Sequence, residues 1–347
     1  MLEIQRYNFF SLLKKIVSLH FEKNKDMISR NSIRIKVMQA IYEYHLSSEK
    51  SMGTVEMNLM QTFDSIYKLY LQLLASFGAL THIAEHIIET KKQKLLPTET
   101  DLHPNYKFVN NLFVKKIEEN TSLQRALRNH HVSWSNDLDM LFIKKVYYQL
   151  SNTPIFVNYM QNHEQSFEED KAFIIEVIEK FLLGNEDICN YLGEKRLHWH
   201  LDYNDVVILV YNTLKSYTKN QKAEKPLPPL FKTNEIDISE DRQFGIDLFW
   251  KTIAHDDEYD LIVEQKLRHW EKDRIAYIDS ILLKMAICEF CEFPTIPLRV
   301  TLNEYIEISK YYSTPKSSHF VNGMLDSILL DLKKEKKVNK QGRGLMG

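Results

Sequence analysis

The chain has 347 residues, with 45 Lys and Arg against 47 Asp and Glu, and carries a formal net charge of −2. Its composition, 44% hydrophobic and 27% charged, is globular and excludes an intrinsically disordered chain and a multi-span membrane protein. With only 9 Gly and 9 Pro, a turn-rich sheet protein is disfavoured and an all-α fold is expected. Three cysteines are too few for a disulfide scaffold and fit a reducing cytosol.

The N-terminal part predicts three helices. Residues 1–23 have apolar side chains at helical spacing, and they lack the apolar run and cleavage site of a signal peptide, so a cytoplasmic protein is expected. A second helix should begin after Ser29 or Asn31, both good caps, and end near Leu46. A long helical stretch follows over about 54–94.

The most apolar window of the chain lies inside this long stretch, at 69–88. It contains Gln72, His82, Glu85 and His86, whose burial in a bilayer would be costly. A core helix of a protein without membrane contact is therefore expected.

The middle of the chain predicts shorter helices between two proline-containing segments. A polar loop surrounds Pro97 and Pro104, and the segment 216–235, with three prolines in four positions, predicts an extended connector. Helix starts are expected at Ser135 and Asn136, Ser166, Asn185 and Asp202. After the connector, helices are expected at 239–255, 257–270, 274–292, 301–311 and 315–335, followed by a basic, frayed tail.

The near-neutral total hides local charge. Residues 1–46 and 331–347 each carry a net charge of +4, whereas residues 161–190 carry −6. Two basic ends could converge on one polyanion, although basic termini are also commonly just solvated.

One motif suggests zinc catalysis. His82, Glu85 and His86 form an H-x-x-E-H string on the long helix, so both imidazoles share a face and could hold a zinc ion, with the glutamate as general base. A third ligand is not evident, and the apolar stripe of the helix already explains its burial. Ordinary core packing is the favoured interpretation.

Two further strings fit packing better than chemistry. Cys288 and Cys291 form a C-x-x-C without a second pair, which predicts two small apolar residues near a helix end. His198 and His200 flank Trp199 in what is expected to be a packed turn before Asp202. No phosphate-binding glycine loop or nucleophile elbow is present, so neither a catalytic residue nor a cofactor is expected.

In the C-terminal part, the run WEKDRIAYIDSILLKMAICEFCE is followed by PLRVTLNEYIEISK and then by HFVNGMLD. These segments resemble the NusB family of bacterial transcription antitermination factors. The matching positions are Trp270, Arg274, Asp279, Leu283, Ala286, Glu289, Pro297, Val300, Asn303, Glu304, Glu307, Lys310, Phe320, Asn322, Gly323, Leu325 and Asp326. Lys284 and His319 depart from the family pattern, standing where it has arginine and lysine.

The segment SRNSIRIKVMQAIYEY resembles the arginine-rich first helix of the same family. Its matching positions are Arg34, Gln39, Ala40 and Tyr42. Between the two matched parts lies a long insertion, similar to that of NusB-like proteins of the Bacteroidetes type. The expected organisation is an N-terminal extension at 1–26 with Met27 as an alternative start, a first bundle part at 27–84, a helical insertion and linker at 85–235, a second bundle part at 236–335 and a disordered tail at 336–347.

The resemblance implies an all-α, NusB-like two-bundle fold and a non-catalytic, RNA-binding function in transcription antitermination. The expected partners are boxA-type single-stranded RNA of ribosomal leaders, the small-subunit ribosomal protein NusE and, indirectly, the transcribing RNA polymerase complex, without a membrane. Gly323 is expected to permit close helix packing. RNA contacts are expected at Arg30, Arg34, Lys36, Phe320 and Asn322, and NusE contacts at Tyr42 and Glu289.

Three alternatives remain. A NusB-like domain joined to an RNA methyltransferase is not expected, since the chain continues only about 21 residues past Asp326. A zinc-dependent hydrolase would use the HIAEH helix. A helical scaffold that has lost RNA affinity would follow from the small number of basic residues in the first helix.

Overall fold

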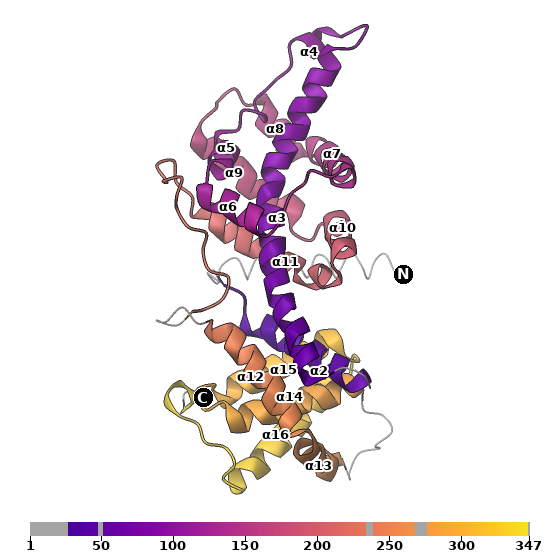
Figure 1. Ribbon diagram of the computed structural model, residues 1–347, viewed down its shortest axis with the longest axis vertical. Helices are drawn as coiled ribbons and strands as arrows, with labels where there is room; N and C mark the ends of the chain where they lie inside the picture. Colours follow the sequence, from indigo (N-terminus) through magenta and orange to yellow (C-terminus); the bar gives the residue numbers. More distant parts are fainter. Residues whose placement is uncertain (1–26, 48–50, 234–238, 268–275, 346–347) are drawn as a thin grey trace. The chain divides into compact units, whose positions relative to one another are not determined.

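The computed structural model describes residues 27–47, 51–233, 239–267 and 276–345 (Figure 1). These residues form helices joined by loops, and their only β-type pairing is an isolated bridge between Thr233 and Ser239. The expected all-α fold is confirmed. The helix expected at 1–23, and the residues Trp270 and Arg274, lie outside the described residues.

The described chain divides into two compact units, the first including residues 64–230 and the second 29–63 and 231–347. The first division falls between Phe63 and Asp64, inside the helix α3 (Met52–Lys92), whereas sequence analysis placed a boundary after residue 84. No cap or proline marks this point, because α3 is one uninterrupted helix whose buried face changes partners along its length.

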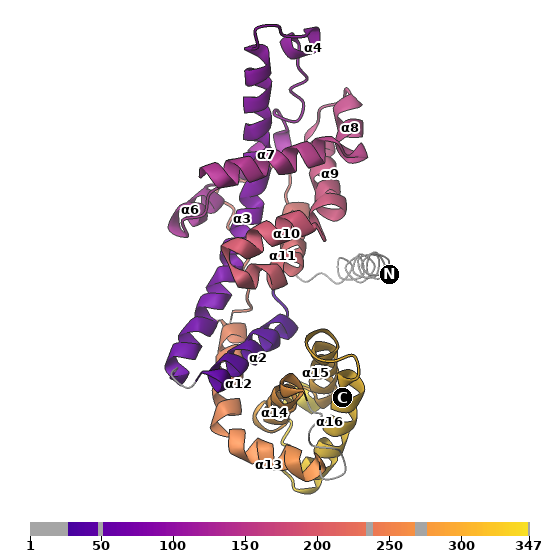
Figure 2. The ribbon, with the colours of Figure 1, turned by 90° about the vertical axis from the view of Figure 1, so that its right-hand side faces the viewer.

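The second unit is built around the helix α14 (Tyr277–Glu292), which lies among the other helices of this unit in Figure 2. This helix packs against all the other long helices of the unit, and its residues from Ile281 to Ala286 are buried without a break. These helices are α2 (Arg30–Leu46), α12 (Glu240–Ala254), α13 (Asp256–Leu267), α15 (Leu298–Tyr312) and α16 (Ser317–Lys334).

One glycine sets how closely α12 approaches its neighbours in this unit. A Cβ atom at Gly245 would lie 2.9 Å from the Phe63 ring and 3.0 Å from a methyl group of Ile33. Gly245 therefore allows α12 to pack directly against α2 and the start of α3.

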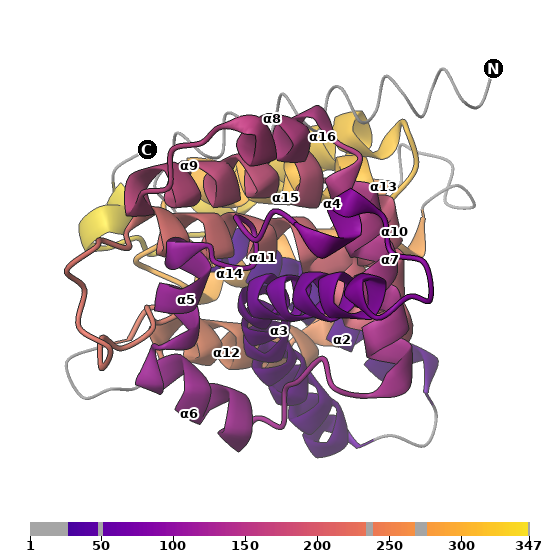
Figure 3. The same cartoon turned by 90° about the horizontal axis from the view of Figure 1, so that it is seen from above.

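The first unit holds the remainder of α3 and a set of shorter helices. Figure 3 shows α5 and α6 on one side of α3 and α7 on the other. The short helices are α4 (Glu99–Leu102), α5 (Leu112–Glu118), α6 (Thr121–Asn129), α7 (Asp137–Ser151), α8 (Pro154–Gln161), α9 (Phe167–Val177), the π-helical turn η1 (Ile178–Leu182), α10 (Glu186–Lys195) and α11 (Leu197–Lys215).

Side-chain caps begin four of the described helices where the sequence predicted. Ser29, Asn136, Ser166 and Asn185 each accept a hydrogen bond from a backbone N–H in the first turn of α2, α7, α9 and α10. Asp202, in contrast, lies buried in the interior of α11 and is not its N-cap residue.

The segment 198–200, expected to be a packed turn before Asp202, instead belongs to the first turn of α11. Its Trp199 is buried, and the indole Nε1 donates to the carbonyl and the hydroxyl of Ser65 at 2.9 and 2.8 Å. This tertiary contact stabilises the start of the helix without a side-chain cap, so no local capping signal could have predicted it.

Among the described helices, α3 alone is long and apolar enough to cross a membrane by length and composition. Its most apolar 18-residue window is 67% buried inside the protein, as expected of a core helix.

The C-terminal tail, expected to be disordered, makes contacts with the end of α14. Lys340 Nζ donates to the backbone carbonyls of Glu289 and Phe293, and the Gln341 N–H donates to the carbonyl of Pro294. The tail thus supplies donors for carbonyls that a helix end leaves without partners, and it continues into a short 3₁₀ turn, Gly342–Leu345.

Candidate functional site

Arg30 is the accessible cation of the first turn of α2. Its Nε donates to Asp241 Oδ1 at 3.1 Å, and its guanidinium lies 4.9 Å from the centroid of the Phe244 ring. The side chain is nevertheless 36% exposed. Arg30 therefore keeps part of its side chain accessible, and its contact with RNA stays a prediction.

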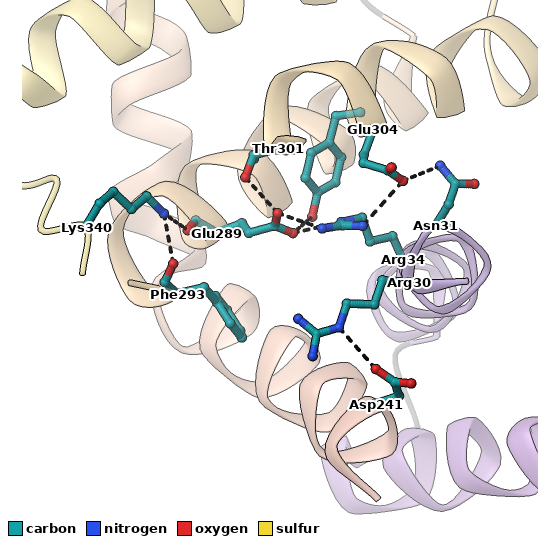
Figure 4. A network of polar contacts seen from close by, with 10 residues as sticks. Arg30, Asn31, Arg34, Asp241, Glu289, Phe293, Thr301, Glu304 and Lys340 are labelled. Atoms are coloured by element: carbon teal, nitrogen blue, oxygen red, sulfur yellow. Dashed lines mark hydrogen bonds and ion pairs between the residues drawn. The ribbon is translucent and has the colours of Figure 1, made fainter. Parts of the chain in front are cut away.

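Arg34 points into the interior instead. Its Nε and Nη2 donate to the two carboxylate oxygens of Glu289, both at 2.8 Å, and its Nη1 lies 3.4 Å from Glu304 Oε2 (Figure 4). The Arg34 side chain is only 2% exposed. The bidentate pair uses the guanidinium fully, so Arg34 does not belong to an RNA-binding surface.

Glu289 is fully buried at the other end of this pair. Besides Arg34, its carboxylate accepts hydrogen bonds from the hydroxyls of Thr301 at 2.7 Å and Tyr305 at 3.2 Å. Burial alone would lower the pKa of Arg34, but the adjacent Glu289 carboxylate and its hydrogen bonds raise that pKa above the ordinary value. Glu289, expected to meet NusE, is a structural residue that holds α2, α14 and α15 together.

Lys36 also departs from the expected surface, because it is buried at 3% exposure. The basic row predicted for α2 is thus not an exposed stripe. The helix places two of its three expected RNA-binding cations inside the unit and leaves Arg30 accessible.

The segment SHFVNG forms the first two turns of α16, within the helix expected at 315–335. Its start is fixed to α14, since Ser317 Oγ donates to the buried Asp279 at 2.6 Å. Phe320 is half-buried and Asn322 is exposed. The first turns of this helix therefore carry an aromatic ring and an amide. Unpaired RNA bases can stack on such a ring and form hydrogen bonds with such an amide.

Gly323 lies on the same helix and is exposed. A Cβ atom built at this position would meet no described atom within 4 Å other than the adjacent residues and the nearby backbone of its own helix. The expectation that Gly323 permits close helix packing is therefore wrong. In a helix interior, glycine is less favourable than alanine. Its presence leaves the backbone of α16 open to the close approach of a ligand.

Tyr42 contributes to an exposed aromatic surface at the C-terminal end of α2. It is 40% exposed and meets Tyr277, itself 44% exposed, edge to face at 5.6 Å. His45 packs beside Tyr277 and lies 3.6 Å from Asp256. Partial burial lowers the pKa of His45, although Asp256 opposes that effect. Tyr277 was missed by sequence analysis because no local pattern links it to Tyr42.

These surfaces lie along one helix. Asp279, which holds the start of α16, and Glu289, which holds Arg34 of α2, are separated by about 15 Å along the axis of α14, at 1.5 Å per residue. Arg34 of α2 and the start of α16 are therefore anchored about 15 Å apart on α14, and Arg30 lies one helical turn before Arg34 and pairs with Asp241 of α12.

The comparison with family models matches the C-terminal part of the chain, including α14 and the first turns of α16. The family model described as the NusB family matches residues 207–330, from the later part of α11 to most of α16. Transcription antitermination protein NusB of Salinibacter ruber is 44% identical over 125 residues, which make up 36% of this chain and 78% of that relative. The chain belongs to the NusB family.

Two further NusB relatives show similar coverage. The transcription antitermination protein NusB of Koribacter versatilis is 33% identical over 142 residues, covering 36% of this chain and 97% of that protein. That of Desulfatibacillum aliphaticivorans is 40% identical over 99 residues, covering 28% and 69%. No solved structure matches the chain.

The two motifs considered for metal chemistry lie on helices of this NusB-family protein. His82, Glu85 and His86 are all exposed on α3, so the string itself is not packed in the core as expected; the buried stripe of the helix is formed by neighbours such as Ile83 and Ile87. Within the described ranges no three His, Cys, Asp or Glu side chains are placed to hold a metal. Cys288 is buried and Cys291 half-buried in the last turns of α14, as predicted for small apolar residues near a helix end. Burial raises the pKa of the Cys291 thiol to about 11, which disfavours the reactive thiolate.

Proposed function

We propose that this transcription antitermination factor binds boxA-type single-stranded RNA jointly with NusE, and that it does so without catalysis. The observation that carries the proposal is the start of α16, where Asn322 and Gly323 are exposed beside the half-buried ring of Phe320. These residues match the family's most specific motif, and they offer an RNA chain a base-stacking face, an amide and an open backbone.

The chemistry of these groups fits unpaired RNA. Bases that are not paired can stack on an aromatic side chain and present their edges to an amide such as that of Asn322. The absence of a side chain at Gly323 allows a base or ribose to approach the helix. Phe320 supplies the stacking face in this proposal, and its buried part fixes the orientation of the ring.

The phosphate contact comes from α2. Arg30 is its accessible cation, one helical turn before Arg34, whose partner Glu289 lies about 15 Å along the axis of α14 from Asp279. An RNA strand of a few nucleotides can extend over this length. The proposed path therefore runs from Arg30 of α2 to Asn322 of α16, and it omits Arg34 and Lys36.

The surface for NusE is the aromatic pair of Tyr42 and Tyr277. Exposed tyrosines combine a large apolar area with a hydroxyl, and they are enriched at protein interfaces. Glu289 is left out because it is buried. In this proposal the factor acts in the cytoplasm and meets the RNA polymerase complex indirectly, through RNA and NusE.

The test measures the binding of a fluorescently labelled boxA-like RNA by anisotropy, with and without NusE. We expect Asn322→Ala and Phe320→Leu each to weaken RNA binding about tenfold, in line with the loss of one base contact. Lys334→Ala, a change at the exposed far end of the same helix, is the matched control and should leave the affinity unchanged.

The protein partner is tested in the same assay. NusE should tighten RNA binding by the wild-type protein, and Tyr42→Ala should remove this gain without changing the affinity measured in its absence. Equal RNA binding by wild type, Asn322→Ala and Phe320→Leu would contradict the proposed RNA surface. If none of the three proteins bound RNA at low salt, the result would favour a helical scaffold without RNA affinity.

A further inference from the structure

The first unit contains an open cleft of about 930 Å³ along one face of α3. Its lining comes from α3, the end of α5, α6, the loop after α6 and the start of α7, and Figure 3 shows α6 and α7 on either side of α3. The lining residues fall within 75–143, outside the residues that match the family model. A cleft of this size is in the upper part of the range typical of small-molecule sites.

One wall of the cleft is rich in nitrogen donors. Arg128 is exposed, and its side chain forms no hydrogen bond or ion pair within the described chain. His82 and His86 face the cleft from successive turns of α3, and His131 lies next to α6. A guanidinium without a carboxylate partner, surrounded by imidazoles, is a suitable environment for an anionic group.

The position of His131 is unusual for its residue type. It follows the end of α6 with a φ of 53°, and Val132 N–H closes the turn by donating to the carbonyl of Leu127 at 2.9 Å. This left-handed position is where helices usually place glycine. The chain instead keeps an imidazole there despite the steric cost, which brings a hydrogen-bonding ring to the edge of the cleft.

The floor of the cleft is apolar and firmly held. Ile83, Trp134 and Ile143 are buried and line it. The indole Nε1 of Trp134 donates to the carbonyl of Gln72 at 2.9 Å, and its ring stacks with Phe142 at 6.4 Å between centroids. A flat, apolar part of a ligand would meet a rigid surface here.

A single carboxylate completes the cleft. Glu118 lies against Gly78 of α3, where a Cβ atom would come within 2.2 Å of its Oε1. The same oxygen lies 3.4 Å from His82 Nε2. Gly78 thus makes room for a carboxylate acceptor beside the apolar floor, on the same face of α3 that carries the two histidines.

We infer that this cleft binds a nucleotide, with the heteroaromatic base over the apolar floor and the phosphate at Arg128 and His131. Glu118 accepts hydrogen bonds from the N–H groups on the edge of the base. The three chemical features of the cleft, a basic wall, a flat apolar floor and one acceptor, match the phosphate, the ring and the donor edge of a nucleotide. The site does not depend on the RNA surface proposed for α2 and α16.

The experiment titrates the full chain with the four nucleoside 5′-monophosphates by isothermal titration calorimetry, alongside the nucleosides and inorganic phosphate. We expect saturable binding of at least one monophosphate at a single site, and at least tenfold weaker binding of its nucleoside and of phosphate. Arg128→Ala should weaken monophosphate binding at least tenfold. Arg125→Ala, which removes an exposed arginine of α6 outside the cleft, is the matched control and should have no effect.

The source of the nucleotide is distinguished with trinucleotides of the same base. Tighter binding of the trinucleotide, lost in Arg128→Ala, identifies a nucleotide within RNA, and tighter binding of the monophosphate identifies a free nucleotide. Circular dichroism of both arginine variants checks that the helices are intact. The inference is overturned if no monophosphate binds at millimolar concentration, if phosphate alone binds equally well, or if Arg125→Ala weakens binding as much as Arg128→Ala.

Discussion

Arg34 shows how a residue expected at a binding surface can be part of the core. Replacement by alanine would leave the Glu289 carboxylate buried without its cation, so we expect Arg34→Ala to lower the free energy of unfolding by about 3–5 kcal/mol. Arg30→Ala removes a partly exposed ion pair and should cost no more than about 1 kcal/mol. Urea denaturation followed by circular dichroism measures both changes.

The same two variants separate stability from RNA binding. Without urea and at a low temperature, both variants should be folded. Under these conditions Arg30→Ala should weaken RNA binding more than Arg34→Ala does. A folded Arg34→Ala protein with wild-type stability and greatly reduced RNA affinity would contradict the structural role assigned to Arg34.

His45 makes the stability of the second unit dependent on pH. Because partial burial lowers the pKa of His45 in the folded protein, protonation favours the unfolded chain. Its contribution to stability is fully present above the unfolded pKa of about 6.5 and is lost as the pH falls through the lower, folded value. Thermal unfolding between pH 8 and pH 5 should therefore show a steeper loss of stability in the wild type than in His45→Gln. Parallel curves for the two proteins would contradict this assignment.

The helices illustrate what local sequence can predict. Ser29, Asn136, Ser166 and Asn185 mark starts correctly because a cap acts on backbone groups of its own first turn. The start of α11 was missed because it depends on Trp199 reaching Ser65 in another helix. Contacts between distant segments also decided which cations of α2 are buried, and no spacing rule reveals them.

Gly323 gives a prediction for the helix α16. Alanine at this exposed position meets nothing beyond its own stretch of helix and raises helix propensity, so we expect Gly323→Ala to stabilise the protein by about 0.5–1 kcal/mol. The added methyl group should at the same time weaken RNA binding, because it fills the open space over the backbone through which the proposed base or ribose approaches the helix. Thermal unfolding and RNA titration of the same sample test both effects, and stabilisation with unchanged RNA affinity would remove Gly323 from the RNA surface.

Across the whole molecule, the family and the fold class could be predicted from sequence, whereas the accessible part of the site could not. The C-terminal motif is long enough to identify the NusB family, and the shortage of glycine and proline indicates helices. Tyr42, Phe320 and Asn322 remain candidates because they are at least partly exposed. The burial of Arg34, Lys36 and Glu289 follows from how α2, α14 and α15 pack. This packing cannot be predicted from the motif.

The salt dependence of RNA binding follows from this distribution of charge. The chain carries a net charge of −2, and of the three cations expected along α2 only Arg30 is accessible, so few phosphates should be neutralised. With about two phosphate contacts, from Arg30 and the exposed Lys316 at the start of α16, the logarithm of the binding constant should fall with the logarithm of salt concentration at a slope of about −1.4. Arg30→Ala should reduce this slope by about 0.7. A slope steeper than about −3 would mean that basic residues outside this surface bind the RNA, and the basic C-terminal segment 331–347 would then be the first to replace with neutral side chains.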